Sequence, residues 1–272
     1  MYIHIYIRTV IAMAISVLIA CKSPLEQLEK KGLELAKEGK NDEAIKTFKQ
    51  LLYLNPTSVV ACLNVGVLYL RNNQMDSSIR YLNNAIDLDS THANAYYNRG
   101  KYYDGVGNFM AALSDFSTCI KLEPNNVKAL VSRGVLYGDV GDTIAELNDY
   151  AKAIKANADY PYSYYNRACY YYNRNAFSIA INDYTLAINK DSAYSQAFIN
   201  RALCYQELNN NAAALLDYSY ALAIDSEDTE ALINRSLLLE KTNPTRAITD
   251  LKKAQQLGDT SATQLLKIYF NQ

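Results

Sequence analysis

The sequence predicts an all-α protein built from stacked helical hairpins, and three observations lead to this fold class. A motif of the form Tyr-x-Asn-Arg-Gly/Ala occurs at residues 96–100 and 164–168, and a close variant follows at 198–202, 34 residues after the second copy. Within a 34-residue unit, small residues recur at positions 8 and 20, and large apolar residues recur at positions 11 and 24. Each of these sets falls on one stripe of a helix, so each unit is predicted to form two amphipathic helices. One hairpin cannot bury these stripes alone, and several must therefore stack.

Seven such units follow one another in phase across residues 25–261. Their boundaries are 25–58, 59–92, 93–126, 127–160, 161–194, 195–228 and 229–261. The last unit is one residue shorter in its turn. Residues 262–272 are predicted to form a final helix that covers the last hairpin with Leu265, Leu266 and Ile268.

Position 8 is small in every unit, which allows the two helices of a hairpin to approach closely. Its occupants are Gly32, Gly66, Gly100, Gly134, Ala168, Ala202 and Ser236. Position 24 is large and is predicted to fill the space beside it, with Phe48, Leu82, Phe116, Tyr150, Tyr184, Tyr218 and Leu251. The tyrosines at position 11 are also predicted to be core: Tyr69, Tyr103, Tyr137, Tyr171 and Tyr205. Glu146 alone departs from the small residues at position 20, which leaves the packing of the fourth unit open.

Gly39, Gly107 and Gly141 are predicted to make the turns inside three of the hairpins. The whole pattern resembles the tetratricopeptide repeat across residues 25–261. The resemblance implies a right-handed superhelical solenoid of seven helical hairpins with a C-terminal capping helix. It also implies a scaffold that binds other proteins.

The first residues are of a different kind. The apolar run of residues 10–20 is shorter than the ~20 residues that a membrane-spanning helix needs. It ends in Leu-Ile-Ala-Cys at Cys21, which resembles a bacterial lipobox. The resemblance implies a signal peptide at 1–20, lipidation of Cys21 and a short tether at 21–24, and hence a lipid-anchored protein of the bacterial cell envelope with the outer membrane as the expected membrane. The alternative is an uncleaved anchor helix with an unmodified Cys21.

Arg at position 7 and Asp at position 23 occur together in the last five units and are both missing from the first two. This joint occurrence predicts structural ion pairs within a repeat, whereas two independent surface preferences are the alternative. The expected pairs are Arg99 with Asp115, Arg133 with Asp149, Arg167 with Asp183, Arg201 with Asp217 and Arg235 with Asp250.

The resemblance further implies that the first helix of each hairpin lines a concave groove. Position 6 on that face is occupied by Asn64, Asn98, Asn166, Asn200 and Asn234. A carboxamide both donates and accepts hydrogen bonds, so these side chains are candidates to hold the backbone of an extended peptide, unless they merely face water. Tyr97, Tyr165 and Tyr172 lie on the same face and offer flat contact area. The expected partner is another protein or peptide segment. The alternative is an assembly or pilot lipoprotein of an outer-membrane or secretion machine that acts through its convex face or its ends.

Other classes of function find little support in the sequence. The net charge is −1, which does not favour binding to nucleic acid. The two histidines, His4 and His92, supply neither a catalytic triad nor a histidine-rich metal site. We therefore expect no enzyme activity and no cofactor, and the oligomeric state stays open. Four cysteines in helical positions are predicted to be buried thiols without disulfides: Cys62, Cys119, Cys169 and Cys204.

Overall fold

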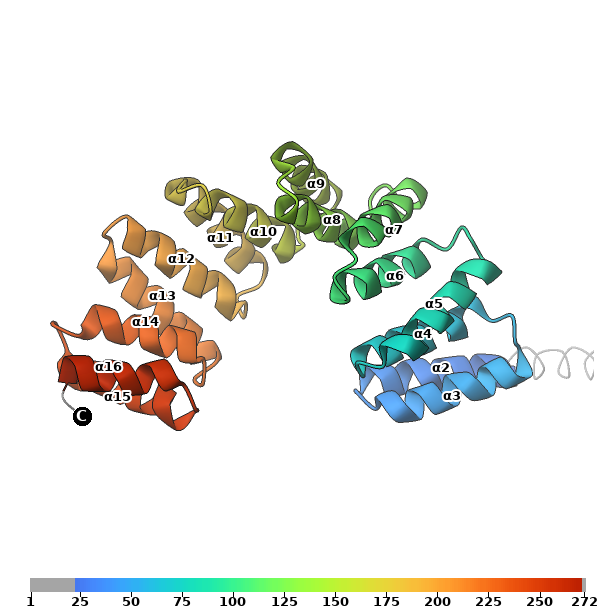
Figure 1. The fold of residues 1–272 in the computed structure, drawn as a ribbon, viewed down its shortest axis with the longest axis horizontal. Helices are drawn as coiled ribbons and strands as arrows, with labels where there is room; N and C mark the ends of the chain where they lie inside the picture. Colours follow the sequence, from blue (N-terminus) through green and yellow to red (C-terminus); the bar gives the residue numbers. More distant parts are fainter. Residues whose placement is uncertain (1–22, 271–272) are drawn as a thin grey trace, which may run out of the picture. The chain divides into compact units, whose positions relative to one another are not determined.

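The structure is a computed structural model that describes residues 23–270. Within these residues every regular element is an α-helix, and the helices form seven consecutive hairpins and one final helix (Figure 1). The hairpins are α2 (Pro24–Lys37) with α3 (Asn41–Leu54), α4 (Val59–Arg71) with α5 (Met75–Leu88), α6 (Ala93–Gly105) with α7 (Phe109–Leu122), α8 (Val127–Asp139) with α9 (Thr143–Ala156), α10 (Pro161–Tyr172) with α11 (Phe177–Lys190), α12 (Ser195–Glu207) with α13 (Asn211–Ile224), and α14 (Thr229–Leu239) with α15 (Pro244–Gln256), followed by α16 (Thr260–Phe270). The predicted fold class of seven hairpins with a final helix is confirmed.

The chain divides into two compact units, Met1–Pro124 and Asn125–Gln272. The described part of the first unit holds the hairpins α2–α3, α4–α5 and α6–α7, and that of the second holds α8 to α16. Within each unit the second helix of a hairpin packs against the first helix of the next, and α16 packs against α15. Each hairpin thus covers the apolar stripe of its neighbour, as the repeat pattern requires.

The two helices of a hairpin meet where position 8 faces position 24. The side chains at position 24, from Phe48 to Leu251, are all fully or almost fully buried. A Cβ atom placed on Gly134 would lie 2.7 Å from the ring of Tyr150, and one on Gly32 would lie 2.7 Å from the ring of Phe48. The predicted pairing of a small residue with a large one is therefore confirmed.

The tyrosines at position 11 are only partly buried, so the expectation that they are core residues is only partly right. Tyr69, Tyr171 and Tyr205 pack against buried clusters but keep part of their surface exposed. The ring of Tyr137 lies under Arg133, with 5.6 Å between the guanidinium carbon and the ring centroid. These amphipathic rings cover the edge of the core rather than its interior.

The turns inside the hairpins use a residue in the left-handed region of backbone space. Gly39, Gly107 and Gly141 have φ values of 76°, 76° and 82°, as expected of turn glycines. Three other hairpins use asparagine at the same place: Asn73, Asn175 and Asn209. Asparagine tolerates this conformation better than most residues with a side chain, which explains how these hairpins turn without glycine.

None of the helices among residues 23–270 combines the length and the apolar character that crossing a membrane would require.

Two glycines of α6 test the close approach. Gly100→Ala puts a Cβ 2.6 Å from the buried ring of Phe116, whereas nothing lies within 4 Å of a Cβ on Gly105. We expect Gly100→Ala to lower the free energy of unfolding by about 1–3 kcal/mol. Gly105→Ala should leave it unchanged or raise it by up to about 1 kcal/mol. Urea unfolding followed by circular dichroism measures both, and equal effects of the two changes would contradict the packing described.

Candidate functional site

Two adjoining cavities lie on the face formed by the first helices of the second unit. We call this face, lined by residues of α8, α10 and α12, the groove face. The polar pocket has a volume of 210 Å³ and lies among α8, α9 and α10, with Gly138, Glu146 and Arg174 in its lining. The apolar pocket has a volume of 310 Å³ and is lined by Tyr172 and Leu203 among others. Cys169 and Asn173 line both cavities, so the two pockets follow one another along this face.

Three of the predicted asparagines share one geometry. The amide nitrogen of Asn64, Asn98 and Asn166 donates to the carbonyl oxygen four residues earlier in its own helix, at 2.8, 2.7 and 2.7 Å. This bond fixes the side chain and uses one N–H. The carbonyl oxygen and the second N–H of each amide are not part of this bond. Asn166 lines the polar pocket, while Asn64 and Asn98 belong to the first unit.

Asn200 differs from these three. Its amide nitrogen donates to the hydroxyl of Tyr165 at 3.0 Å, and its Oδ1 accepts from Gln196 at 3.1 Å. Both ends of this carboxamide are therefore held by neighbouring side chains, although the residue lines the apolar pocket. Asn234 is half-buried on α14.

The predicted groove tyrosines take different places. Tyr172 lines the apolar pocket. Tyr165 is half-buried, with its ring centroid 4.8 Å from that of Tyr194, and it supports Asn200 rather than standing free. In the first unit, Tyr97 packs against Phe116 with 5.8 Å between ring centroids.

The structure shows how Glu146 is accommodated at position 20, where the other repeats have a small residue. Its side chain belongs to α9, is only 7% exposed and lines the polar pocket. Its Oε1 would lie 2.9 Å from a Cβ on Gly138, so the glycine at position 12 makes room for the carboxylate. Burial raises the pKa of Glu146, while the charge of Arg174 and a hydrogen bond with Tyr150 offset part of the rise. Sequence reasoning treated Glu146 only as a packing defect, although Gly138 in the same repeat was a signal of its partner.

The cysteines of the described residues are free thiols, three of them buried. Burial raises the pKa of Cys119 to about 11 and that of Cys204 to about 12. In the groove face, Cys169 accepts a hydrogen bond from the hydroxyl of Tyr184 at 3.3 Å, and burial raises its pKa as well. These thiols stay protonated at neutral pH and are poor nucleophiles and metal ligands.

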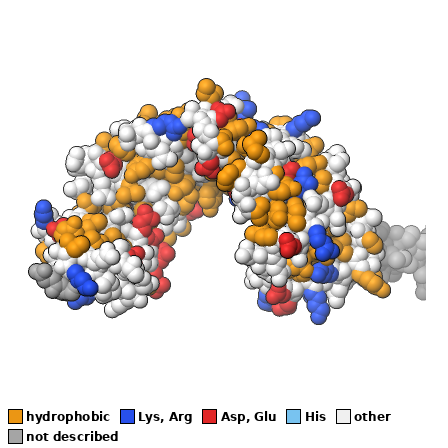
Figure 2. Space-filling model, viewed as in Figure 1, with side chains coloured by type: hydrophobic (Ala, Val, Ile, Leu, Met, Phe, Trp, Pro, Cys, Tyr) orange, Lys and Arg blue, Asp and Glu red, His pale blue; other side chains and the backbone are white. Residues whose placement is uncertain are grey.

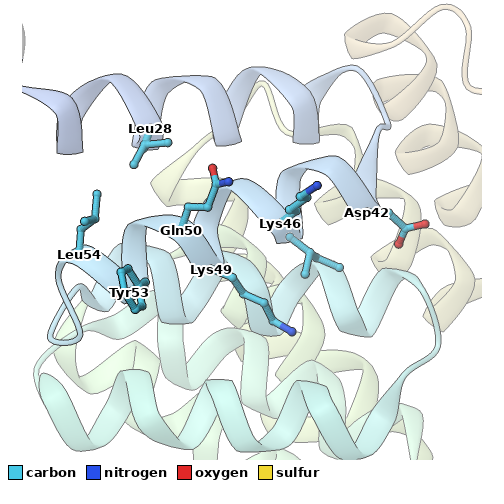
Figure 3. Close-up of a pocket in the computed structure, with 8 residues that line it drawn as sticks. Leu28, Asp42, Lys46, Lys49, Gln50, Tyr53 and Leu54 are labelled. Atoms are coloured by element: carbon cyan, nitrogen blue, oxygen red, sulfur yellow. The ribbon is translucent and has the colours of Figure 1, made fainter.

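A second hollow surface lies on the first hairpin, between α2 and α3 (Figure 3). We call it the end surface; its cavity of 670 Å³ is lined by Leu28, Asp42, Ile45, Lys46, Lys49, Gln50, Tyr53 and Leu54. Tyr53 is 87% exposed, and Leu54 is exposed beside it. A hydrogen bond with Tyr69 raises the pKa of Lys49. Figure 2 shows hydrophobic, basic and acidic side chains next to one another over this part of the first unit.

Two other predictions concern metal sites and the lipid anchor. Among residues 23–270 there is no group of three His, Cys, Asp or Glu side chains arranged to hold a metal ion. Cys21 and the signal sequence before it lie outside the residues that the structure describes.

Part of the chain is similar to a known family of helical repeats. Residues 29–93 and residues 93–126 match models of the tetratricopeptide repeat. This match covers most of the three hairpins of the first unit. No curated protein matches the sequence.

Solved tetratricopeptide-repeat structures share the fold. A tetratricopeptide repeat protein from Parabacteroides merdae is 20% identical, with 91% of this chain and 99% of that chain covered and a TM-score of 0.66. PilW, described as a widely conserved type IV pilus biogenesis factor, is 13% identical over 78% of this chain and 98% of that one, with a TM-score of 0.69. YrrB, described as a tetratricopeptide-repeat protein with an unusual peptide-binding site, is 19% identical over 68% of this chain and 95% of its own, with a TM-score of 0.50. At sequence identities this low, the similarity shows only that these proteins share a fold.

The structure brings each of the five Arg and Asp partners together within its own hairpin. The closest nitrogen–oxygen distances are 2.8 Å for Arg99–Asp115, 2.7 Å for Arg133–Asp149, 2.7 Å for Arg167–Asp183, 2.8 Å for Arg201–Asp217 and 2.8 Å for Arg235–Asp250. In every pair Nε and one Nη donate to the two carboxylate oxygens, which is the bidentate geometry that favours arginine over lysine.

The arginines also join neighbouring repeats, which the sequence did not indicate. The remaining nitrogen of Arg201 donates to Thr185 Oγ1 at 2.9 Å. In the same way Arg99 reaches Asn83 Oδ1 at 2.9 Å. Both acceptors stand at position 25 of the preceding repeat, so one guanidinium ties three helices together.

The pair of Arg201 and Asp217 offers a test of this role. Asp217 is 2% exposed, so Arg201→Ala leaves a buried carboxylate without its partner. We expect this change to lower the free energy of unfolding by about 3–5 kcal/mol. The double variant Arg201→Met, Asp217→Leu removes both charges and should lose much less. Urea unfolding of the two variants measures the difference, and a double variant that loses as much stability as Arg201→Ala would contradict this role of the pair.

Proposed function

We propose that this chain is a binding scaffold whose groove face holds an extended segment of another protein. Tetratricopeptide repeats generally mediate protein–protein interaction and are typically not catalytic. The observation that carries the proposal is the pair of adjoining pockets on the groove face, one polar and one apolar. Neighbouring pockets of different chemistry suit alternate side chains of an extended peptide, which point to the same side.

The fixed carboxamide of Asn166 supports the same use. Its bond to the Tyr162 carbonyl holds the side chain in one position, so little side-chain entropy is lost when a ligand binds. The backbone of a peptide supplies both a donor and an acceptor for the groups of the amide that this bond leaves unused. Of the predicted asparagines, we therefore assign Asn166 to binding of the peptide backbone. Asn200 instead holds the side chain of Tyr165 in place through a hydrogen bond.

A peptide selection tests the groove. Peptides are first selected from a random display library against the full-length chain in detergent micelles. We expect these peptides to bind Asn166→Ala and Leu203→Ala less tightly than the parent, with a Kd about fivefold higher or more. Leu216→Ala on α13 is the matched control, since Leu216 is exposed and belongs to a second helix. Circular dichroism verifies that the variants fold. Peptides that bind all three variants as tightly as the parent would contradict the proposal.

We further propose that Cys21 carries the lipid that anchors the protein in the bacterial cell envelope. The support is the lipobox-like sequence that ends at Cys21, and the first described helix begins only three residues later at Pro24. Such a short connection would keep the first repeat close to the membrane surface.

Metabolic labelling with a radioactive fatty acid checks the anchor. Label should enter the expressed chain and be absent from Cys21→Ser, which should also leave the membrane fraction. Cys62→Ser is the control, since Cys62 is a buried thiol of the first unit. Equal labelling of the parent and Cys21→Ser would contradict lipidation.

The end surface favours a second candidate function, that of an assembly or pilot lipoprotein. Exposed Tyr53 and Leu54 beside basic side chains present an apolar surface that a partner could cover. PilW is described as a pilus biogenesis factor, and its likeness to this chain concerns the fold. For this candidate, Tyr53→Asp would abolish partner assembly while Leu203→Ala would preserve it, which is the reverse of the result expected for the groove.

A further inference from the structure

We propose that the polar pocket binds the ammonium group of a lysine side chain, contributed by the segment that the groove face holds. The inference rests on the proposed function, because it assigns one residue of that segment to one place on the groove face.

The size and position of the pocket suit a side chain. Its volume of 210 Å³ is below the roughly 300–1,000 Å³ of sites for small molecules and cofactors. Asn166 and Cys169 of α10 line it, and Cys169 also lines the neighbouring apolar pocket. A peptide that follows the groove face can therefore place one side chain in each pocket.

Glu146 makes the pocket negative. Glu146 is 7% exposed, and within residues 23–270 no lysine or arginine lies close enough to form an ion pair with it. Arg174, the cation of the lining, attracts the carboxylate from a greater distance, and Tyr150 forms a hydrogen bond with the carboxylate. The guanidinium of Arg174 stacks on Tyr170, 3.7 Å from the ring centroid, and donates to the Tyr170 carbonyl at 3.3 Å. A largely buried carboxylate without a direct ion pair destabilises the fold, and a ligand ammonium in contact with Glu146 would supply that pair.

The remaining lining matches an ammonium group rather than a carboxylate. An ammonium has three donors and no acceptor. Glu146, the Oδ1 of Asn166 and the exposed Asp139 provide acceptor oxygens around the cavity. Two acidic residues and one arginine leave the lining with a net negative charge, which repels an acidic side chain.

Packing does not require this arrangement. Five of the seven repeats have a fully buried alanine at position 20. Only the fourth repeat combines Glu at position 20 with Gly at position 12, and the glycine leaves the space that the carboxylate fills. A side chain that costs stability and has its own space is typical of a binding site.

Two small probes test the pocket without knowledge of the partner. Nα-acetyl-lysine methylamide carries the ammonium group, and the corresponding norleucine compound keeps the carbon chain without the charge. Titrated into the full-length ¹⁵N-labelled chain in detergent micelles, the lysine probe should shift the backbone amide resonances of Gly138, Glu146 and Cys169. The norleucine probe should bind about tenfold more weakly or not at all.

Glu146→Gln should weaken binding of the lysine probe about tenfold, whereas the exposed control Glu227→Gln should not change it. Glu146→Gln should fold, and at pH 7 it should be at least as stable as the parent. Burial raises the pKa of Glu146, so ionisation destabilises the folded state as the pH rises, and the advantage of glutamine shrinks at low pH.

Equal responses to the two probes, or an unchanged response in Glu146→Gln, would overturn the lysine site. The outcome is separable from that of the peptide selection. If the selected peptides lose affinity in Asn166→Ala and Leu203→Ala but contain no lysine whose binding is weakened by Glu146→Gln, only the lysine site would be wrong. A positive lysine probe together with peptides that ignore the groove face would overturn the proposed function alone.

Discussion

The contact between a small residue at position 8 and a large one at position 24 is the constraint on which the rest of the structure depends. It limits how closely the two helices of a hairpin can approach, because a Cβ atom on Gly134 would lie only 2.7 Å from the ring of Tyr150. Because the same contact recurs in every repeat, the first helices of a unit present equivalent faces. Arginine–aspartate pairs then fix the last five hairpins, and the bonds of Arg99 to Asn83 and of Arg201 to Thr185 tie two of these hairpins to the preceding one.

The sequence predicted these regular features because they repeat. A 34-residue period reveals helices, turns and ion-pair partners, since each is sampled several times in one chain. Features that occur once carried no such signal. The use of Asn200 to support Tyr165 depends on a side-chain orientation that spacing does not specify. The position-11 tyrosines, predicted to be core, have an amphipathic ring that can lie at the core edge.

Glu146 is the instructive exception. At the level of sequence it breaks a packing rule, and in the structure Gly138 restores the packing while the carboxylate lines a pocket. A rule broken together with a compensating change nearby indicates function rather than a defect. The groove face thus combines side chains at a repeated position, such as Cys169 and Leu203, with one unrepeated carboxylate, to which we assign the selectivity of the proposed site.

Site-specific photocrosslinking measures most directly whether the groove face holds another protein. A photoreactive phenylalanine replaces Leu203 on α12 in one variant and Leu216 on α13 in the other, and crosslinked peptides are identified by mass spectrometry from cells that express the chain. The account predicts crosslinks from position 203 to one continuous stretch of a partner that contains a lysine, with few from position 216. Equal crosslinking from both positions, or crosslinks from position 203 scattered over many unrelated surfaces, would contradict it.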